Sequence, residues 1–231
     1  MSGEARRQRL RALLRLAGVR KPGDLAVVEK AFVHESHARE RGGDSNERME
    51  FLGDSVLGFI TASWLFDRYG DEAEGLLTLR RAAIVNDVRL AHTARRLGFA
   101  DVLHLGSGMR TGGGADNTTV LAGAFEAFVA ALYLAYGAEK ARKFVVDEHV
   151  ERFDHSVDEL IDAKTRLQHY AQEYLSATPV YRETSRGTPQ QPAFSSRVSV
   201  KGKTLGTGRG PSKKAAQQAA AEAALISLQV R

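Results

Sequence analysis

The stretch NERMEFLGDSVLGFI, residues 46–60, places a cluster of acids inside an apolar segment. Its three carboxylates, Glu47, Glu50 and Asp54, alternate with Met49, Phe51, Leu52, Val56, Leu57 and Ile60. On one helix the three acids project within about 60° of one another. Clustered carboxylates repel one another and lose hydration on burial, so the pattern favours a nearby cation such as Mg²⁺, which prefers oxygen ligands. The alternative interpretation is an exposed acidic face beside Arg48.

Apolar residues recur at helical spacing on both sides of this stretch. The periodic segments are 6–17, 25–38, 47–69, 74–84, 87–97, 119–136 and 139–153. They end at glycine or proline signals, and the glycine-rich 106–116 predicts a loop. No run with a period of two stands out, so this part predicts an all-α domain. Within it, Glu126 is a lone acid in a very apolar segment, which is rarely a packing residue.

From Asp162 onward the pattern changes to that of a small α+β domain. Residues 162–175 predict a helix with Asp162 as its N-cap. Three alternating segments then predict strands, at 178–185, at 193–200 and within 201–208, with Lys201-Gly202 at the turn before the third. An alanine-rich segment at 212–228 predicts a final helix. The order is α-β-β-β-α. We therefore expect a first domain at 1–153, a linker at 154–161 and a second domain at 162–231.

Composition narrows the class of protein. The chain has 231 residues and no cysteine, which excludes disulfides and thiolate metal sites and favours a reducing compartment. The N-terminal MSGEARRQRLRALLRLAG is basic and amphipathic, unlike a signal peptide. No run approaches the ~18 apolar residues of a membrane span. We therefore expect a soluble, cytoplasmic protein without a membrane partner.

The positive charge is concentrated in the second domain. Residues 162–231 contain eleven Lys and Arg against four Asp and Glu, a net charge of +7, so residues 1–161 carry −2 of the total of +5. Ser212, Lys213 and Lys214 begin the last helix, where free N–H groups and the helix dipole favour anions. The glycines before them lack the Lys-Ser/Thr ending of a phosphate-binding loop, so no nucleotide cofactor is expected. This domain therefore predicts a polyanion partner.

Several of these segments resemble the ribonuclease III family. NERMEFLGDSVL closely resembles the family signature, and AFVHESHARE resembles the stretch before it. AEGLLTLRRA and TTVLAGAFEAFVAALYL are similar to later conserved blocks. The α-β-β-β-α segment is similar to the family's double-stranded RNA-binding domain. The resemblance covers nearly the whole chain in the same order.

The resemblance implies a metal-dependent endoribonuclease for double-stranded RNA. Its metal ligands would be Glu50, Asp54 and Glu126, with Asp54 and Glu126 catalytic and with Glu47 and Glu74 as supporting acids. The ion would be Mg²⁺, with Mn²⁺ as an alternative. The products would carry 5′-phosphate and 3′-hydroxyl ends, from ribosomal RNA precursors and structured messenger RNA. A homodimer is implied as well, and the apolar part of 47–60 is its candidate surface, although core packing explains the same residues.

The second domain would read the shape, phosphates and 2′-hydroxyls of an RNA duplex. Thr165 and Gln168, one turn apart, would enter a minor groove, and the loop at 185–194 with Gln190 would touch a second one. Ser212, Lys213 and Lys214 would hold the phosphates between them. The family often has His where Gln190 stands and Glu where His169 stands, which changes the contacts more than the function.

One position departs from the family pattern. Three residues before Glu126 the family has an Asp, and here Gly123 takes its place. We expect water to replace the missing carboxylate and metal affinity to fall by about 10–100-fold. The alternative is a non-cleaving double-stranded RNA-binding protein with a degenerate nuclease site. The retained acids favour the enzyme.

Overall fold

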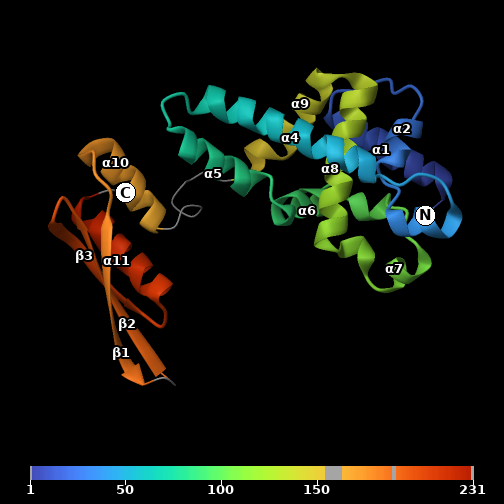
Figure 1. Cartoon of the computed structure of the whole chain (residues 1–231). Coiled ribbons are helices and arrows are strands. Elements are labelled where there is room, and N and C mark those ends of the chain that lie inside the picture. Colours follow the sequence, from blue (N-terminus) through green and yellow to red (C-terminus); the bar gives the residue numbers. More distant parts are fainter. Residues whose placement is uncertain (1, 154–162, 189–190, 230–231) are drawn as a thin grey trace. The chain divides into compact units, whose positions relative to one another are not determined.

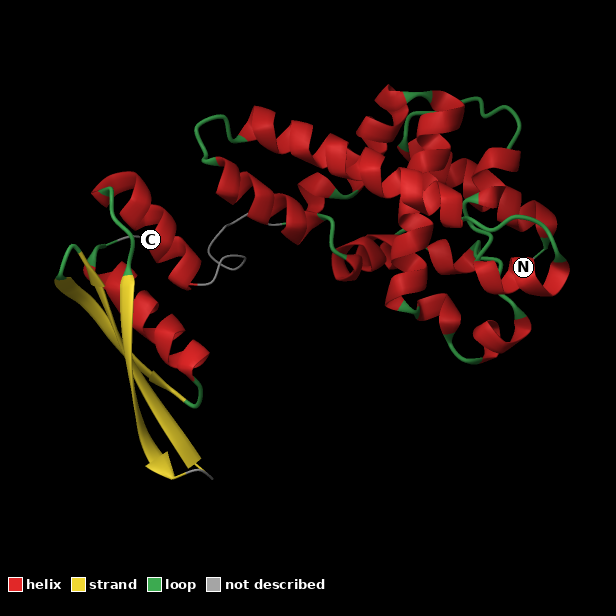
Figure 2. Ribbon diagram, in the orientation of Figure 1, coloured by secondary structure: helices red, strands yellow, loops and turns green. Residues whose placement is uncertain are grey.

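The computed structural model describes residues 2–153, 163–188 and 191–229. The chain divides into two compact units, Met1–His155 and Ser156–Arg231. The first is built of helices, and the second is a three-stranded sheet with two helices (Figures 1 and 2). The predicted fold class is therefore confirmed. The linker at 154–161 lies outside the described residues, so the exact domain limits stay predictions.

The first unit follows most of the predicted helices. Its elements are α1 (Gly3–Leu16), α2 (Ala26–Lys30), α3 (Glu35–Arg41), α4 (Glu47–Arg68), α5 (Glu74–Ile84), α6 (Asp87–Arg96), η1 (Phe99–Asp101), α7 (Ser107–Thr111), η2 (Gly114–Asp116), α8 (Thr118–Tyr136), α9 (Ala138–Glu148) and η3 (Val150–Arg152). The helix predicted at 25–38 is two helices, because Val33 leaves the helix to form a parallel bridge with His104. The loop predicted at 106–116 contains α7 and η2.

Helix α8 is the centre of this unit (Figure 1). Its buried Phe125 and Phe128 belong to an aromatic cluster with Phe32, Phe99 and Phe144. By length and composition α8 could span a membrane, in contrast to the prediction that no segment approaches such a span. However, 67% of that helix window is buried inside the unit, as in the core helix of a globular domain.

Helix α4 crosses α8 at very short range, and a glycine makes this possible. A methyl group built on Gly53 of α4 would overlap the backbone carbonyl of Glu126 on α8. Only a residue without a side chain permits such an approach. Because Asp54 is next to Gly53 and Glu50 is one turn before it, the crossing brings the acids of α4 to Glu126.

The second unit has the elements α10 (Ala163–Leu175), β1 (Val180–Thr188), β2 (Gln191–Val200), β3 (Lys203–Gly210) and α11 (Lys213–Ser227). The sheet is antiparallel in the order β1-β2-β3. Lys201 and Gly202 join β2 to β3 with φ of 51° and 78°, as the central pair of a tight hairpin turn requires. The loop predicted at 185–194 is mostly strand, since β1 and β2 pair as far as Thr188 and Gln191.

Both helices of the second unit cover the same face of its sheet (Figure 2). Leu167 of α10, Val198 of β2 and Leu225 of α11 share one apolar cluster with several alanines. Gly206 and Gly208 lie so close to α11 that an added Cβ would overlap its backbone. The other face of the sheet is therefore left without helices. Asp162, the predicted N-cap of α10, lies outside the described residues.

Candidate metal centre and RNA-binding surface

An open cavity of about 380 Å³ lies where α4 crosses α8. Glu47, Glu50, Phe51 and Asp54 line it from α4, and Glu126 lines it from α8. Every other described residue from Val120 to Leu132 is buried, and Glu126 alone is partly exposed. Four of the five predicted acids thus share one cavity, although they come from two helices far apart in the sequence.

Gly123 lies under the carboxyl group of Glu50. A Cβ built on Gly123 would be 2.6 Å from Oε2, 2.8 Å from Cδ and 3.1 Å from Oε1 of Glu50. The space in which a side chain at 123 would begin is therefore taken by Glu50. Water in place of the missing carboxylate stays a prediction, and the structure brings the Glu50 carboxylate from the facing helix beside this position.

The carboxyl groups are held where their charges are unfavourable. Burial, followed by the negative charges of Asp54, Glu50 and Asp87, raises the pKa of Glu126 to about 8. Burial, followed by the charges of Glu47 and Asp87, also raises the pKa of Glu50. A divalent cation in the cavity would favour the charged form of both groups and so reverse these shifts.

Asp87 is an acid that the sequence reasoning missed. It is the first residue of α6, after Asn86, whose side chain caps that helix by accepting from Arg89 N. An acid in a first helical turn is usually explained by the helix dipole, so no sequence pattern connects Asp87 with the cavity. The structure brings its charge within reach of both Glu50 and Glu126.

The two supporting acids lie in different surroundings. Glu47 lines the cavity and accepts a hydrogen bond of 2.6 Å from Ser45 Oγ. Glu74 begins α5, outside the residues that line the cavity, and accepts a hydrogen bond of 2.8 Å from Thr78 Oγ1. A supporting role for Glu74 at the same site stays a prediction.

The donor set suits a hard divalent ion, because carboxylate oxygens are the ligands that Mg²⁺ and Mn²⁺ take. In the described parts of the chain, no three His, Cys, Asp or Glu side chains already form a group that could hold a metal ion. The fit therefore rests on the shared cavity and on the raised pKa of Glu126 and Glu50, not on a preformed cluster.

The predicted RNA contacts of the second unit lie on α10 and at the start of α11. Gln168 is exposed and Thr165 is half-buried, one turn apart on α10. Ser212 caps α11 by accepting a hydrogen bond of 3.1 Å from Ala215 N, and the exposed Lys213 and Lys214 follow it. Gln190 lies outside the described residues.

Two family models match the chain and together cover most of it. Residues 24–153 match the model described as Ribonuclease-III-like, and residues 163–228 match the double-stranded RNA binding motif. Among curated proteins, the chain is 40% identical over 202 residues to Ribonuclease 3 of Thermobifida fusca, a match that covers 86% of this chain and 84% of the relative. It is 41% identical over 207 residues to Ribonuclease 3 of Symbiobacterium thermophilum, which covers 88% of each chain.

A solved structure resembles the helical unit. The nuclease domain of ribonuclease III from Campylobacter jejuni superposes with a TM-score of 0.58 and 29% sequence identity, and the match covers 63% of this chain and 97% of that one. That structure is described as showing flexibility in a region involved in dimer formation.

Proposed function

The chain belongs to the ribonuclease III family and is an endoribonuclease specific for double-stranded RNA, and we propose that it cuts with a Mg²⁺ ion held by Glu50, Asp54 and Glu126. Mn²⁺ is the alternative ion. The observation that carries this proposal is the glycine-mediated crossing of α4 and α8, which places these three carboxylates, together with Glu47, around one cavity.

The protein groups hold and orient, and the ion supplies the chemistry. A bound divalent ion neutralises phosphate charge and makes an attacking water more acidic. Asp54 and Glu126 face one another across the crossing and would fix the position of that ion beside the scissile phosphate. Because the pKa of Glu126 is raised to about 8, its carboxyl group must give up a proton before it can hold a cation. Glu47, on the rim of the cavity, would orient the groups that approach it.

We propose further that the products carry 5′-phosphate and 3′-hydroxyl ends. Hydrolysis by an attacking water on the phosphorus, with the 3′ oxygen leaving, produces these ends. We also propose ribosomal RNA precursors and structured messenger RNA as substrates, and the cytoplasm as the place of action. Family membership supports these three assignments.

A second copy of the chain is the proposed protein partner. Helix α4 divides its apolar residues between two uses: Leu57 and Leu65 are buried, whereas Phe51, Phe59 and Phe66 are 80%, 73% and 70% exposed. Beside Phe59 a hollow of about 510 Å³ is lined mainly by α4 and the start of α9. Exposed aromatic rings next to a hollow favour a self-complementary interface. A homodimer would put two cutting sites on one duplex.

The test is cleavage of a long RNA duplex with Mg²⁺ by the full chain and by Glu126→Gln. The wild type should give short duplex products. The cleavage rate of Glu126→Gln should be lower by at least about 100-fold, because a neutral amide replaces one of the carboxylate ligands. RNA binding measured without a divalent ion should stay unchanged. Glu151→Gln, an exposed carboxylate outside the cavity, is the matched control and should cut like the wild type.

The rival function is a protein that grips duplex RNA without cutting it, for which Gly123 is the supporting observation. A gel shift without any cleavage across a full range of Mg²⁺ and Mn²⁺ concentrations would establish that function instead. Parallel loss of binding and cutting in Glu126→Gln would also contradict the proposed division between the two units.

A further inference from the structure

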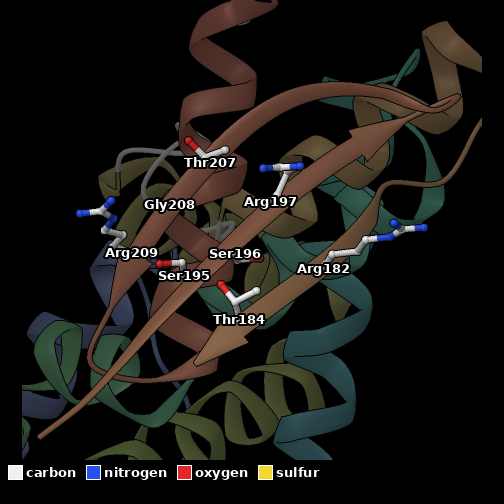
Figure 3. Close-up of a pocket in the computed structure, with 8 residues that line it drawn as sticks. All are labelled: Arg182, Thr184, Ser195, Ser196, Arg197, Thr207, Gly208 and Arg209. Carbon is white, nitrogen blue, oxygen red and sulfur yellow. The ribbon is translucent and has the colours of Figure 1, made fainter. Parts of the chain in front are cut away.

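The helix-free face of the sheet carries an ordered set of hydrogen-bond donors (Figure 3). Antiparallel pairing places Arg182 opposite Arg197 and Arg197 opposite Thr207, in one row across three strands. The neighbouring row contains Thr184, Ser195 and Arg209. Ser196 and Gly208 complete the lining of a hollow of about 640 Å³ over these rows. Three guanidinium groups and three hydroxyls therefore share one shallow surface.

The charge on this face is not balanced. Arg182, Arg197 and Arg209 are exposed, and none forms an ion pair with any carboxylate in the described part of the unit. Glu183, between two outward residues of β1, points to the other face and accepts from Gln217 of α11. Arg182 and Arg197 stand directly opposite one another, an arrangement of like charges that weakens strand pairing. An anionic partner would turn this unfavourable pair into a favourable one.

This surface is separate from the RNA contacts predicted on α10 and α11. Thr165 and Gln168 belong to α10, and Lys213 and Lys214 begin α11, and both helices pack against the opposite face of the sheet. The unit therefore presents positive charge on two sides.

We propose that the outer sheet face, formed by Arg182, Arg197, Arg209, Thr184, Ser195 and Thr207, binds the sugar–phosphate backbone of a second segment of duplex RNA. Guanidinium groups pair with phosphate oxygens in a bidentate manner, and hydroxyls bond phosphate and sugar oxygens. The face lacks an aromatic side chain among its lining residues, so it has no platform on which unpaired bases could stack. It also lacks an aliphatic or aromatic pocket that would anchor an acidic peptide.

The partner follows from the double-stranded RNA specificity of the chain, but the proposal does not depend on cutting. With a first segment of duplex on α10 and α11, the outer face would hold a second duplex segment, either a neighbouring helix of the same folded RNA or a helix of a second RNA molecule. This surface adds a sequence-independent contact, and its strength depends on salt.

The first experiment measures the salt dependence of RNA binding in EDTA by the full chain. Arg182→Gln, Arg197→Gln and Arg209→Gln are combined in one variant and compared with Lys213→Ala combined with Lys214→Ala. Binding is measured to a duplex of about 16 base pairs, the span of one such unit, and to a long structured RNA. On the long RNA the triple variant should bind at least about 10-fold more weakly, with a log–log salt slope reduced by about 2 to 3. On the short duplex at equimolar ratio it should bind like the wild type.

The second experiment uses the absence of cysteine in the chain. Thr207→Cys receives a thiol-specific photo-cross-linker and is exposed to labelled long RNA. Gln168→Cys is the positive control, and Ile226→Cys, on the exposed side of α11, is the negative control. We expect cross-links from the probes at 207 and 168 and none from that at 226. Far-ultraviolet circular dichroism and the unfolding temperature show that each variant is folded.

An unchanged salt slope in the triple variant, or no RNA cross-link at 207 while the probe at 168 cross-links, overturns the proposal. The proposal is also overturned if the probe at 207 cross-links an acidic peptide added beside the RNA and cross-links no RNA. If the chain does not cut RNA but both surfaces still bind it, the result would contradict the proposed metal chemistry and not the proposed RNA contact of the outer sheet face.

Discussion

The contact between Gly123 and Glu50 allows the steric and chemical roles of position 123 to be separated. Any side chain at 123 must displace the Glu50 carboxyl group, because its Cβ would start 2.6 Å from Oε2 and 2.8 Å from Cδ. Ordinary carbon contacts begin near 3.5 Å, so the carboxyl group must move by roughly 1 Å. Since Glu50 ends in a flexible chain, it can move without breaking the fold.

Gly123→Ala imposes this movement and supplies no ligand. We therefore expect the Mg²⁺ concentration for half-maximal cutting to rise by about 10-fold, the lower end of the effect of disturbing a group that supports a metal. Gly123→Asp imposes the same movement but adds a carboxylate, so its Mg²⁺ requirement should return to the wild-type value or fall below it. Gly123→Asn has the same bulk as Asp without the charge, and should behave like Gly123→Ala.

The assay is the cleavage rate of one RNA duplex across a Mg²⁺ series for the wild type and the three variants. Mn²⁺ binding without RNA, followed by calorimetry, separates metal affinity from catalysis. Equal Mg²⁺ requirements for the wild type and Gly123→Ala would show that the position of Glu50 does not matter. If Gly123→Asp were no better than Gly123→Asn, position 123 would lie outside the influence of the ion.

Four further predictions follow from the same structure. In metal-free buffer, folded Glu126 keeps its proton up to a pH of about 8, whereas in the unfolded chain it loses the proton near its ordinary pKa of 4.5, so the wild type loses stability as the pH rises between these values. At pH 8.5 Glu126→Gln should therefore unfold about 2–4 °C higher than the wild type, for ~1 kcal/mol after solvent screening. At pH 4.5 a thermal melt should show no advantage for the variant. Gly53→Ala should lower the unfolding free energy by about 1–3 kcal/mol because the helices must part, while Gly58→Ala, on the same helix with open space, should be neutral or stabilising in the same denaturant titration. Lys213→Ala with Lys214→Ala should weaken RNA binding and reduce its salt slope by about 2, and an unchanged slope would remove these residues from the RNA contact. Phe59→Arg should shift the proposed dimer to monomer in sedimentation, and an unchanged sedimentation coefficient would place Phe59 outside the interface.

The sequence predicted the parts of the fold that depend on local pattern. Helices such as α4 and α8 carry long periodic apolar runs, and the hairpin at Lys201 and Gly202 carries its own turn chemistry, so each could be placed without a partner. The acids of α4 could be grouped because they belong to one helix. Their meeting with Glu126 required the resemblance to a family, since no local rule relates positions some 70 residues apart.

The misses depend on contacts between distant segments. Residues 106–116 form short helices because Ser107 N bonds the Glu40 carboxylate at 2.8 and 2.9 Å and Gly106 N bonds Ser36 Oγ at 3.0 Å. The helix predicted at 25–38 is interrupted because His34 N bonds the His104 carbonyl at 3.1 Å. Composition and periodicity indicate glycines and apolar spacing, but they do not indicate hydrogen-bond partners from distant segments. For the same reason Asp87 and the paired arginines of the sheet became visible only in three dimensions.

The apolar character of α8 affects the chain when it is not folded. In the folded unit its neighbours cover this helix, but in an unfolded or newly made chain it exposes a segment that lipid bilayers and chaperones would bind. Helices α4 and α6, which cover α8, precede it in the chain. During synthesis they are therefore already present when α8 is made. In a heat-unfolded chain all segments are exposed at once, so we expect such a chain to aggregate more readily than a newly synthesised one.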